Sequence, residues 1–315
     1  MENMRTAGIH HISAIVGHPQ ENVDFYAGIL GLRMIKKTIN FDDPGTYHLY
    51  FGDEAGTPGT IMTFFPWPKA ISGRIGTGQV GVTTFVVPTG SLPFWKERLE
   101  TFEVAVKEEV RFNEDILSFE DPHGLRLEIV AREGGENSTW SFGSVTPSVA
   151  IKGFGGATLL SAKPNETAHL LEHVLGLTRI GEENGIIRFQ SEATIGNIID
   201  IQTDETVRGL AGAGTVHHIA WRAQDNAEHE KWREHVTNSG YHVTPVKDRN
   251  YFNAIYFKEH GNILFEIATD PPGFSIDEQV EKLGEKLMLP EWYEEQREKI
   301  EEALIPITVK ELEKE

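Results

Sequence analysis

The chain has 315 residues, no cysteine and a formal net charge of −19. A chain of this length usually forms more than one domain, so we expect two halves, each with its own core. The strong negative charge argues against binding nucleic acid or an anionic membrane surface, because both require positive patches. Without cysteine, a disulfide framework, a thiolate metal site and a thiol nucleophile are excluded, and any metal must be held by nitrogen and oxygen ligands.

The start of the sequence has no basic segment followed by an apolar run, and no stretch approaches the ~20 apolar residues that a membrane span requires. We therefore expect a cytoplasmic protein with a small-molecule ligand, without nucleic acid or membrane as a partner. The sequence leaves the oligomeric state open, a homo-oligomer included.

The first unit, residues 8–65, has the pattern β-α-β-β-β. An apolar run over 10–16 predicts a strand, and apolar residues at helical spacing over 23–30 predict a helix that ends at Gly31. Clusters of Asp, Pro and Gly, which are typical of turns, separate the strand-like runs that follow. These runs cover 33–41, 46–51 and 60–65.

The same order of elements recurs three times in the rest of the chain. The second unit runs from a strand over 79–87 to a closing strand over 125–129. The third unit starts near Val149, and the fourth runs from Val216 to a closing strand over 261–267. Repetition of one supersecondary unit predicts an α+β fold of paired modules, because each curved sheet needs a partner to cover its concave face.

The stretch 131–147 is rich in Gly, Ser and Glu and has little periodicity, so we interpret it as a linker between domains. On this basis an N-terminal domain of modules 1 and 2 covers 1–135, and a C-terminal domain of modules 3 and 4 covers 148–270. The remaining segment, 275–315, is predicted to form an acidic helical tail. Its carboxylates are expected to form a solvated face.

A histidine doublet opens the first and the fourth unit, as His10-His11 and His217-His218, whereas the second and third units open without histidine. Gly156 stands at the corresponding place in the third unit. A lone histidine in an apolar strand is more often a hydrogen-bonded core residue than a ligand. Because successive strand side chains point to opposite faces, however, one histidine of each doublet can face a shared cavity.

Glu266 lies in the closing strand of the fourth unit, in an apolar run where an unpaired carboxylate would be costly. With His11 and His218 it predicts a centre of two histidines and one carboxylate, which suits non-haem Fe(II), with Mn(II) as the close alternative. Convergence of these residues requires modules 1 and 4 to pair across the chain. Glu128 has similar surroundings but no histidine nearby, so we interpret it as structural and paired with Arg126 or another cation.

The repeated units, the doublets and the closing glutamate resemble the vicinal oxygen chelate superfamily. More narrowly, the chain is similar to bacterial ring-cleaving dioxygenases of the hydroquinone type, and this resemblance extends over about the whole sequence. The stretches that carry it most specifically are 8–12, 41–51, 56–60, 216–218, 248–252 and 265–266.

The resemblance implies roles for seven residues and an activity. The implied iron ligands are His11, His218 and Glu266, and the implied catalytic residues beside them are His10, His217, Arg249 and Tyr256. The implied activity is Fe(II)-dependent, extradiol-type cleavage of a hydroquinone or related aromatic diol by O₂, in aromatic catabolism or quinone detoxification. The two doublet histidines or the tyrosine would move the ring proton, and the arginine would stabilise developing negative charge.

The nearest alternative on the same fold is a glyoxalase-like, metal-dependent isomerase or lyase. Such sites usually add a fourth protein ligand from the last strand of the partner module. Aligning Gly59 with Gly261 puts Phe64 opposite Glu266, and the nearby Met62 and Thr63 are not carboxylates. Three protein ligands leave room for substrate and oxygen, which favours the dioxygenase.

Two further alternatives belong to other functional classes. Residues 169–173 match the H-x-x-E-H pattern of a zinc peptidase. They fall on the packing helix of the third unit, however, where solvent-exposed histidines are expected. The other alternative is a non-catalytic small-molecule-binding protein of this fold, which would not explain why the doublet recurs only in modules 1 and 4.

Overall fold

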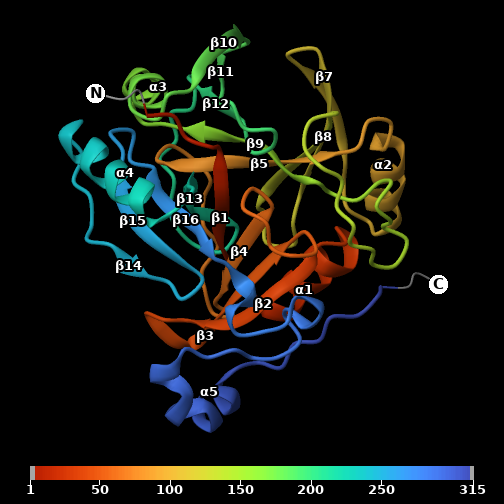
Figure 1. Cartoon of the computed structure of the whole chain (residues 1–315). Helices are drawn as coiled ribbons and strands as arrows, with labels where there is room; N and C mark the ends of the chain where they lie inside the picture. The colour runs from red at the N-terminus through yellow and green to blue at the C-terminus, as the bar shows by residue number, and fades with distance from the viewer. Residues whose placement is uncertain (1–3, 313–315) are drawn as a thin grey trace.

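The computed structural model describes residues 4–312 and contains two eight-stranded sheets with short helices at their periphery (Figure 1). Each sheet combines two of the β-α-β-β-β modules, one from each half of the chain. The predicted α+β fold of four modules is therefore confirmed. Modules 1 and 4 form one sheet, called here the 1–4 sheet, and modules 2 and 3 form the other, called the 2–3 sheet.

The 1–4 sheet has the strand order β14-β15-β16-β13-β1-β4-β3-β2. The elements of module 1 are β1 (Ile9–Val16), α1 (Pro19–Val23), the π-helix η1 (Asp24–Ile29), β2 (Arg33–Asn40), β3 (Asp43–Gly52) and β4 (Ile61–Pro66). The elements of module 4 are β13 (Thr215–Ala223), α4 (Asn226–Asn238), β14 (Lys247–Asp248), β15 (Phe252–Lys258) and β16 (Leu264–Pro272).

The 2–3 sheet has the equivalent order β10-β11-β12-β9-β5-β8-β7-β6. The elements of module 2 are β5 (Gln79–Val87), α2 (Leu92–Thr101), β6 (Lys107–Arg111), β7 (Glu114–Glu120) and β8 (Arg126–Ala131). The elements of module 3 are β9 (Gly153–Leu160), α3 (Pro164–His173), β10 (Thr178–Glu183), β11 (Ile186–Gln190) and β12 (Ile198–Gln202).

Antiparallel pairing of first strands joins the modules within each sheet. β1 pairs with β13, and β5 pairs with β9. The pairing of modules 1 and 4 across the chain is thus confirmed. The division of the sequence into segments 1–135 and 148–270 stays a prediction, and each sheet takes one module from either segment.

The central strands are buried on both faces, which explains their continuous apolar character. All eight residues of β1 are buried, as are all eight of β9. Alternation of polar and apolar residues is expected where one sheet face meets water, and it appears over residues 117–120 of β7. A buried histidine in β1 or β13 therefore lies in an environment that penalises an unpaired polar group.

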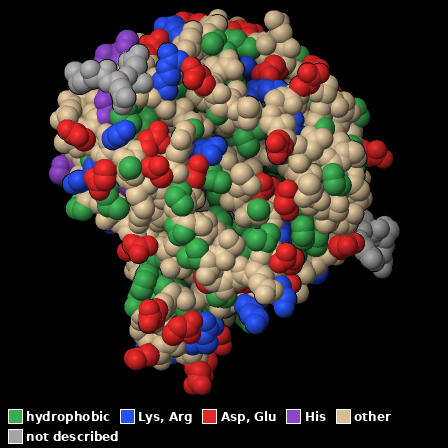
Figure 2. Space-filling model, in the orientation of Figure 1, with side chains coloured by type: hydrophobic (Ala, Val, Ile, Leu, Met, Phe, Trp, Pro, Cys, Tyr) green, Lys and Arg blue, Asp and Glu red, His purple; other side chains and the backbone are tan. Residues whose placement is uncertain are grey.

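The tail after Gly273 is mostly irregular and packs along β2 and the β2–β3 turn. Its short helices are η2 (Phe274–Ile276), η3 (Val280–Lys282), η4 (Glu291–Gln296) and α5 (Arg297–Ala303). Figure 2 shows acidic side chains gathered over the protrusion that carries α5 in Figure 1.

The expectation that the tail carboxylates are all solvated is wrong for Asp277 and Glu278. They bind the fully buried Lys36 Nζ at 2.6 and 2.5 Å. The ammonium of Lys36 requires such partners because a buried unpaired charge is unstable.

In the part of the chain that the structure describes, every helix is too short or too polar to cross a membrane.

Candidate metal centre

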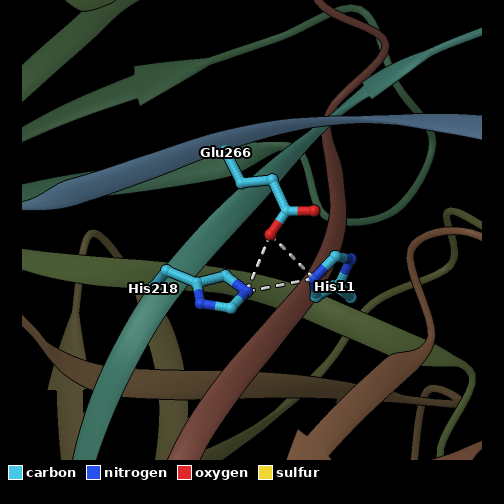
Figure 3. A group of neighbouring side chains, drawn as sticks. All are labelled: His11, His218 and Glu266. Carbon is cyan, nitrogen blue, oxygen red and sulfur yellow. Dashed lines mark hydrogen bonds and ion pairs between the residues drawn. The ribbon is translucent and has the colours of Figure 1, made fainter. Parts of the chain in front are cut away.

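Three side chains from three neighbouring strands meet at the centre of the 1–4 sheet (Figure 3). β1 supplies His11, β13 supplies His218 and β16 supplies Glu266. The two Nε2 atoms lie 3.2 Å apart, and Glu266 Oε2 lies 2.8 Å from His218 Nε2 and 3.4 Å from His11 Nε2. Among residues 4–312, this is the one group of three or more His, Asp or Glu side chains close enough to share an ion.

The carboxylate of Glu266 tests whether the group fits a cation. Glu266 is fully buried, and within the described residues neither of its oxygens has a hydrogen-bond partner of acceptable geometry. Burial acts to raise the pKa of Glu266, but His11 and His218 outweigh it and hold this pKa well below its ordinary value. A buried anion that faces two imidazole nitrogens is an arrangement that a bound cation would stabilise. The donor set, two nitrogens and one oxygen, suits Fe(II) or Mn(II).

The other histidine of each doublet holds its neighbour in one tautomer. His10 Nδ1 lies 2.9 Å from His11 Nδ1, and His217 Nδ1 lies 2.7 Å from His218 Nδ1. Each pair is satisfied when Nδ1–H of the inner histidine donates to the outer one, which leaves the inner Nε2 lone pair free. Burial lowers the pKa of His10 well below its ordinary value, and burial lowers the pKa of His217 to about 4, so both can act as neutral acceptors.

Arg249 and Tyr256 form a second polar pair beside the centre. Arg249 Nε donates to Tyr256 Oη at 3.2 Å, and the same guanidinium reaches Asp42 Oδ2 at 3.4 Å across the mouth of the site. Burial raises the pKa of Tyr256 well above its ordinary value, so this phenol keeps its proton. The arrangement can present a hydroxyl donor and a positive charge to a bound anion.

A cavity of about 250 Å³ opens over the three converging side chains. All predicted site residues except His10 line it, and aromatic rings form much of its remaining wall. These aromatic rings belong to Phe41, Tyr50, Phe65, Trp67 and Phe252. The size and composition suit one small aromatic ring next to the metal position.

Four polar residues of module 1 were missed as site residues: Ser13, His48, Tyr50 and Thr63. His48 and Tyr50 line the cavity, and the four side chains are joined by hydrogen bonds. The sequence could have indicated His48 and Tyr50, because they lie two residues apart, on the same face of a strand, within a stretch that carries the resemblance. Their partner Thr63 lies in an ordinary apolar strand, and only the fold brings it to them.

The structure also corrects the expected counterpart of Glu266 in module 1. Glu266 pairs with Ala220, two residues after His218, whereas Thr63 pairs with Ser13, two residues after His11. Thr63 is therefore the counterpart, and the sequence alignment on Gly59 was wrong by one residue. The position still lacks a carboxylate, and the three-ligand centre stays a prediction.

The structure also bears on the interpretations of Glu128 and of the histidine pattern at 169–173. Glu128 is bound by Arg111 at 2.7 and 3.1 Å, so its partner is another cation than Arg126. His169 and His173 lie exposed on α3, as expected for solvent-facing residues. Neither belongs to a group that could hold an ion within residues 4–312.

The family model of the Glyoxalase/Bleomycin resistance protein/Dioxygenase superfamily matches residues 8–129 and 154–277. The chain belongs to this superfamily. Within it, the chain is 63% identical to MhqO of Bacillus subtilis, named a ring-cleaving dioxygenase, over 98% of this chain and 99% of that protein. It is 34% identical to the chlorohydroquinone/hydroquinone 1,2-dioxygenase of Sphingobium indicum, over 90% and 91%. These relatives confirm the predicted family and the prediction of a dioxygenase enzyme.

Solved structures agree with this assignment. A crystal structure of a dioxygenase from Bacillus subtilis superposes with a TM-score of 0.97 at 62% identity, over 98% of this chain and all of that one. Glyoxalase I of Zea mays superposes with a TM-score of 0.62 at 11% identity, over 84% of this chain and 92% of that one. At that identity the likeness to glyoxalase I shows the shared fold alone.

Proposed function

We propose that the protein is an Fe(II)-dependent, extradiol-type dioxygenase that cleaves hydroquinones or closely related dihydroxylated aromatics. The observation that carries the proposal is the buried Glu266 carboxylate, which faces two imidazole nitrogens without a hydrogen-bond partner among residues 4–312. The names of the relatives supply the reaction class, and one of them names hydroquinone and chlorohydroquinone. Mn(II) stays an alternative occupant of the same ligands.

His11, His218 and Glu266 would hold the metal, which when bound would lower the pKa of a ring hydroxyl and pass charge between ring and oxygen. The remaining steps belong to side chains of the cavity. The aromatic walls would hold the ring and exclude water from it. With three protein ligands and Thr63 in place of a fourth, the metal position stays open toward the cavity.

The polar residues around the ligands have separate roles in this proposal. His10 and His217, neutral in the fold, would accept a hydrogen bond from Nδ1 of the ligand histidines and keep them oriented. Arg249 would balance negative charge as the ring hydroxyl loses its proton. Tyr256, which keeps its own proton, would donate a hydrogen bond to the charged ring oxygen or return a proton later in the reaction.

The test is anaerobic reconstitution with Fe(II), then with Mn(II), followed by oxygen uptake with hydroquinone, chlorohydroquinone and catechol. We expect one bound iron per chain and one O₂ consumed per ring opened, with hydroquinones preferred over catechol. Absence of uptake with every diphenol, despite one bound iron, would sink the proposal. The cytoplasmic location stays a prediction from the sequence.

A glyoxalase-like isomerase or lyase is less well supported by the site. A hydroxyl residue, Thr63, occupies the place where that class would need a fourth protein ligand such as a carboxylate. A metal-free binding protein is also less well supported, because it would have no use for two imidazole nitrogens and a carboxylate that converge within 3.4 Å.

A further inference from the structure

His48 of β3 sits in a hydrogen-bonded chain that nothing in the proposed reaction has used so far. Its Nδ1 lies 2.9 Å from Tyr50 Oη, and its Nε2 lies 2.9 Å from Thr63 Oγ1. Thr63 Oγ1 in turn lies 2.7 Å from Ser13 Oγ. The imidazole is also packed against the rings of Tyr50 and Phe65, with centroid distances of 4.1 and 4.3 Å. Its orientation is therefore fixed on both edges and by stacking.

The strand registers show that the hydrogen-bonded residues of module 1 correspond to residues of module 4 around Glu266. In module 4, Tyr256 and Glu266 are paired across β15 and β16. In module 1, Tyr50 and Thr63 are paired in the same way across β3 and β4. Tyr50 is thus the counterpart of Tyr256, as Thr63 is of Glu266. The two tyrosines line the same cavity, and each is contributed by a different module.

The two walls differ in what accompanies each tyrosine. On the module 4 wall the tyrosine meets the guanidinium of Arg249 and has a carboxylate across the ladder. On the module 1 wall Thr63, which is smaller than its counterpart Glu266, leaves space beside Tyr50. His48 reaches Thr63 there. The counterpart of His48 in module 4 is Ala254. One wall therefore pairs its phenol with a cation, and the other pairs its phenol with a proton acceptor.

We propose that Tyr50 and His48 are the proton-transfer pair of the ring-cleavage reaction, with Tyr50 touching the ring hydroxyl and His48 acting through Tyr50. This inference rests on the proposed function. The ring O–H bond breaks and its proton forms an O–H bond on Tyr50, while the original Tyr50 proton moves to His48 Nδ1. His48 then carries protons on both nitrogens, with Nε2–H bonded to Thr63, until the reverse transfer protonates the opened product.

The resting protonation states agree with this direction of transfer. Burial lowers the pKa of His48 well below its ordinary value, so the imidazole is neutral and can accept a proton at Nδ1. Burial raises the pKa of Tyr50, so the phenol gives up its proton only as it receives another. Thr63 and Ser13 complete the chain with hydroxyls that can each accept one hydrogen bond and donate the next.

The test compares Tyr50→Phe and His48→Gln with His235→Gln. The glutamine at 48 can keep hydrogen bonds but cannot carry a second proton. His235 is a partly buried histidine on α4 whose Nε2 meets Val174 O, away from the cavity, so its variant controls for loss of a histidine. Iron content, kcat and KM are measured for each iron-loaded protein. A second readout, under argon, is the phenolate absorbance of bound 4-nitrophenol at a pH below its own pKa.

We expect kcat to fall by about 100-fold or more in Tyr50→Phe and in His48→Gln, the range of a lost proton-transfer group, with KM and iron content close to those of the parent. The phenolate fraction of bound 4-nitrophenol should fall in both variants and stay unchanged in His235→Gln. If both variants keep the parent kcat and phenolate fraction, or both lose iron, the inference is overturned while the dioxygenase proposal stands. A parent protein with bound iron but no turnover would instead sink the proposed function.

Discussion

The 1–4 sheet and the 2–3 sheet share one topology but differ at the residues that face the centre of each cup. The register that places Glu266 beside Ala220 places Glu128 beside Thr84 and Asp200 beside Thr158. The ligand histidine His218 lies two residues before Ala220. The residues two positions before Thr84 and Thr158 are Val82 and Gly156. The 2–3 sheet thus keeps a carboxylate in both modules but has no histidine at either ligand position.

The carboxylates of the 2–3 sheet are neutralised by arginine. Arg111 binds Glu128 at 2.7 and 3.1 Å, and Arg188 binds Asp200 at 2.8 and 2.9 Å. The cavity between these groups is about 10 Å³, against about 250 Å³ in the 1–4 sheet. The fold supplies the position of the acid, and the neighbouring side chains decide whether it forms an internal ion pair or, as proposed for Glu266, holds a metal.

Backbone contact makes this difference hard to reverse in module 3. A Cβ atom on Gly156 would lie 2.2 Å from Ile198 O, far inside van der Waals contact. A histidine at that position would therefore force β9 away from β12. The absence of histidine there is a packing requirement of this copy of the module.

The largest expected effect separates the two glutamates. Glu266→Gln should weaken iron binding by more than about 100-fold, beyond the loss seen for residues that only orient ligands, and oxygen uptake should disappear. Glu128→Gln is the matched control, and it should keep iron while losing stability, because it weakens the pairing of Arg111. Iron content after desalting and urea unfolding measure the two properties. Equal iron loss in both variants would contradict the expectation that Glu266 binds metal while Glu128 only forms an ion pair.

Removal of a guanidinium should destabilise the 2–3 sheet without touching the metal. Arg188→Met leaves Asp200, which is 3% exposed, without its bidentate partner. Breaking a buried pair in this way costs about 3–5 kcal/mol of the free energy of unfolding. Chemical unfolding checks the magnitude, and an unchanged iron content checks the location. A loss below about 1 kcal/mol, the value of an exposed pair, would show that the network adds little.

Replacement of Arg249, the arginine beside the proposed metal position, should affect turnover and leave stability nearly unchanged. The Arg249 guanidinium donates hydrogen bonds to Tyr256 and Asp42. Within residues 4–312 no guanidinium binds Glu266. Arg249→Met should lower kcat/KM by about tenfold, which corresponds to about 1.4 kcal/mol of lost charge stabilisation. Arg233→Met, at an exposed pair on α4, serves as the control for a lost arginine. Similar oxygen uptake by both variants would show that Arg249 has no role in turnover.

The smallest effect concerns a structural histidine near the same sheet. Burial lowers the pKa of His229, and its Nε2–H donates to Ile267 O at 2.8 Å. The unfolded chain, with a histidine pKa of about 6.5, binds the proton first as pH falls. The contribution of His229 is therefore complete above pH ~6.5 and is lost below it, by at most about 1.4 kcal/mol per pH unit.

Urea unfolding of the metal-free protein between pH 5 and pH 7.5 measures this slope. The slope should be smaller in His229→Gln than in the parent, while the other buried histidines contribute equally to both. Parallel curves for the two proteins would show that His229 is not a neutral core histidine.

Local sequence determined a large part of this protein. Period-two and helical patterns gave the four modules, and the doublets His10-His11 and His217-His218 marked the two modules that had to pair. Glu266 was recognisable because a carboxylate in an apolar closing strand needs a partner. The family resemblance added Arg249 and Tyr256, whose local surroundings alone would have indicated an ion pair and a strand aromatic.

Tertiary structure decided the contacts between residues of different strands. It chose Arg111 as the partner of Glu128, brought Lys36 to the tail carboxylates, and placed Thr63 opposite Glu266. A strand pattern fixes which face a side chain points to, but the register and the crossing strand decide what it meets there. The two histidine pairs could thus be identified from sequence alone, whereas the link from His48 through Thr63 to Ser13 exists only because β1, β3 and β4 lie side by side.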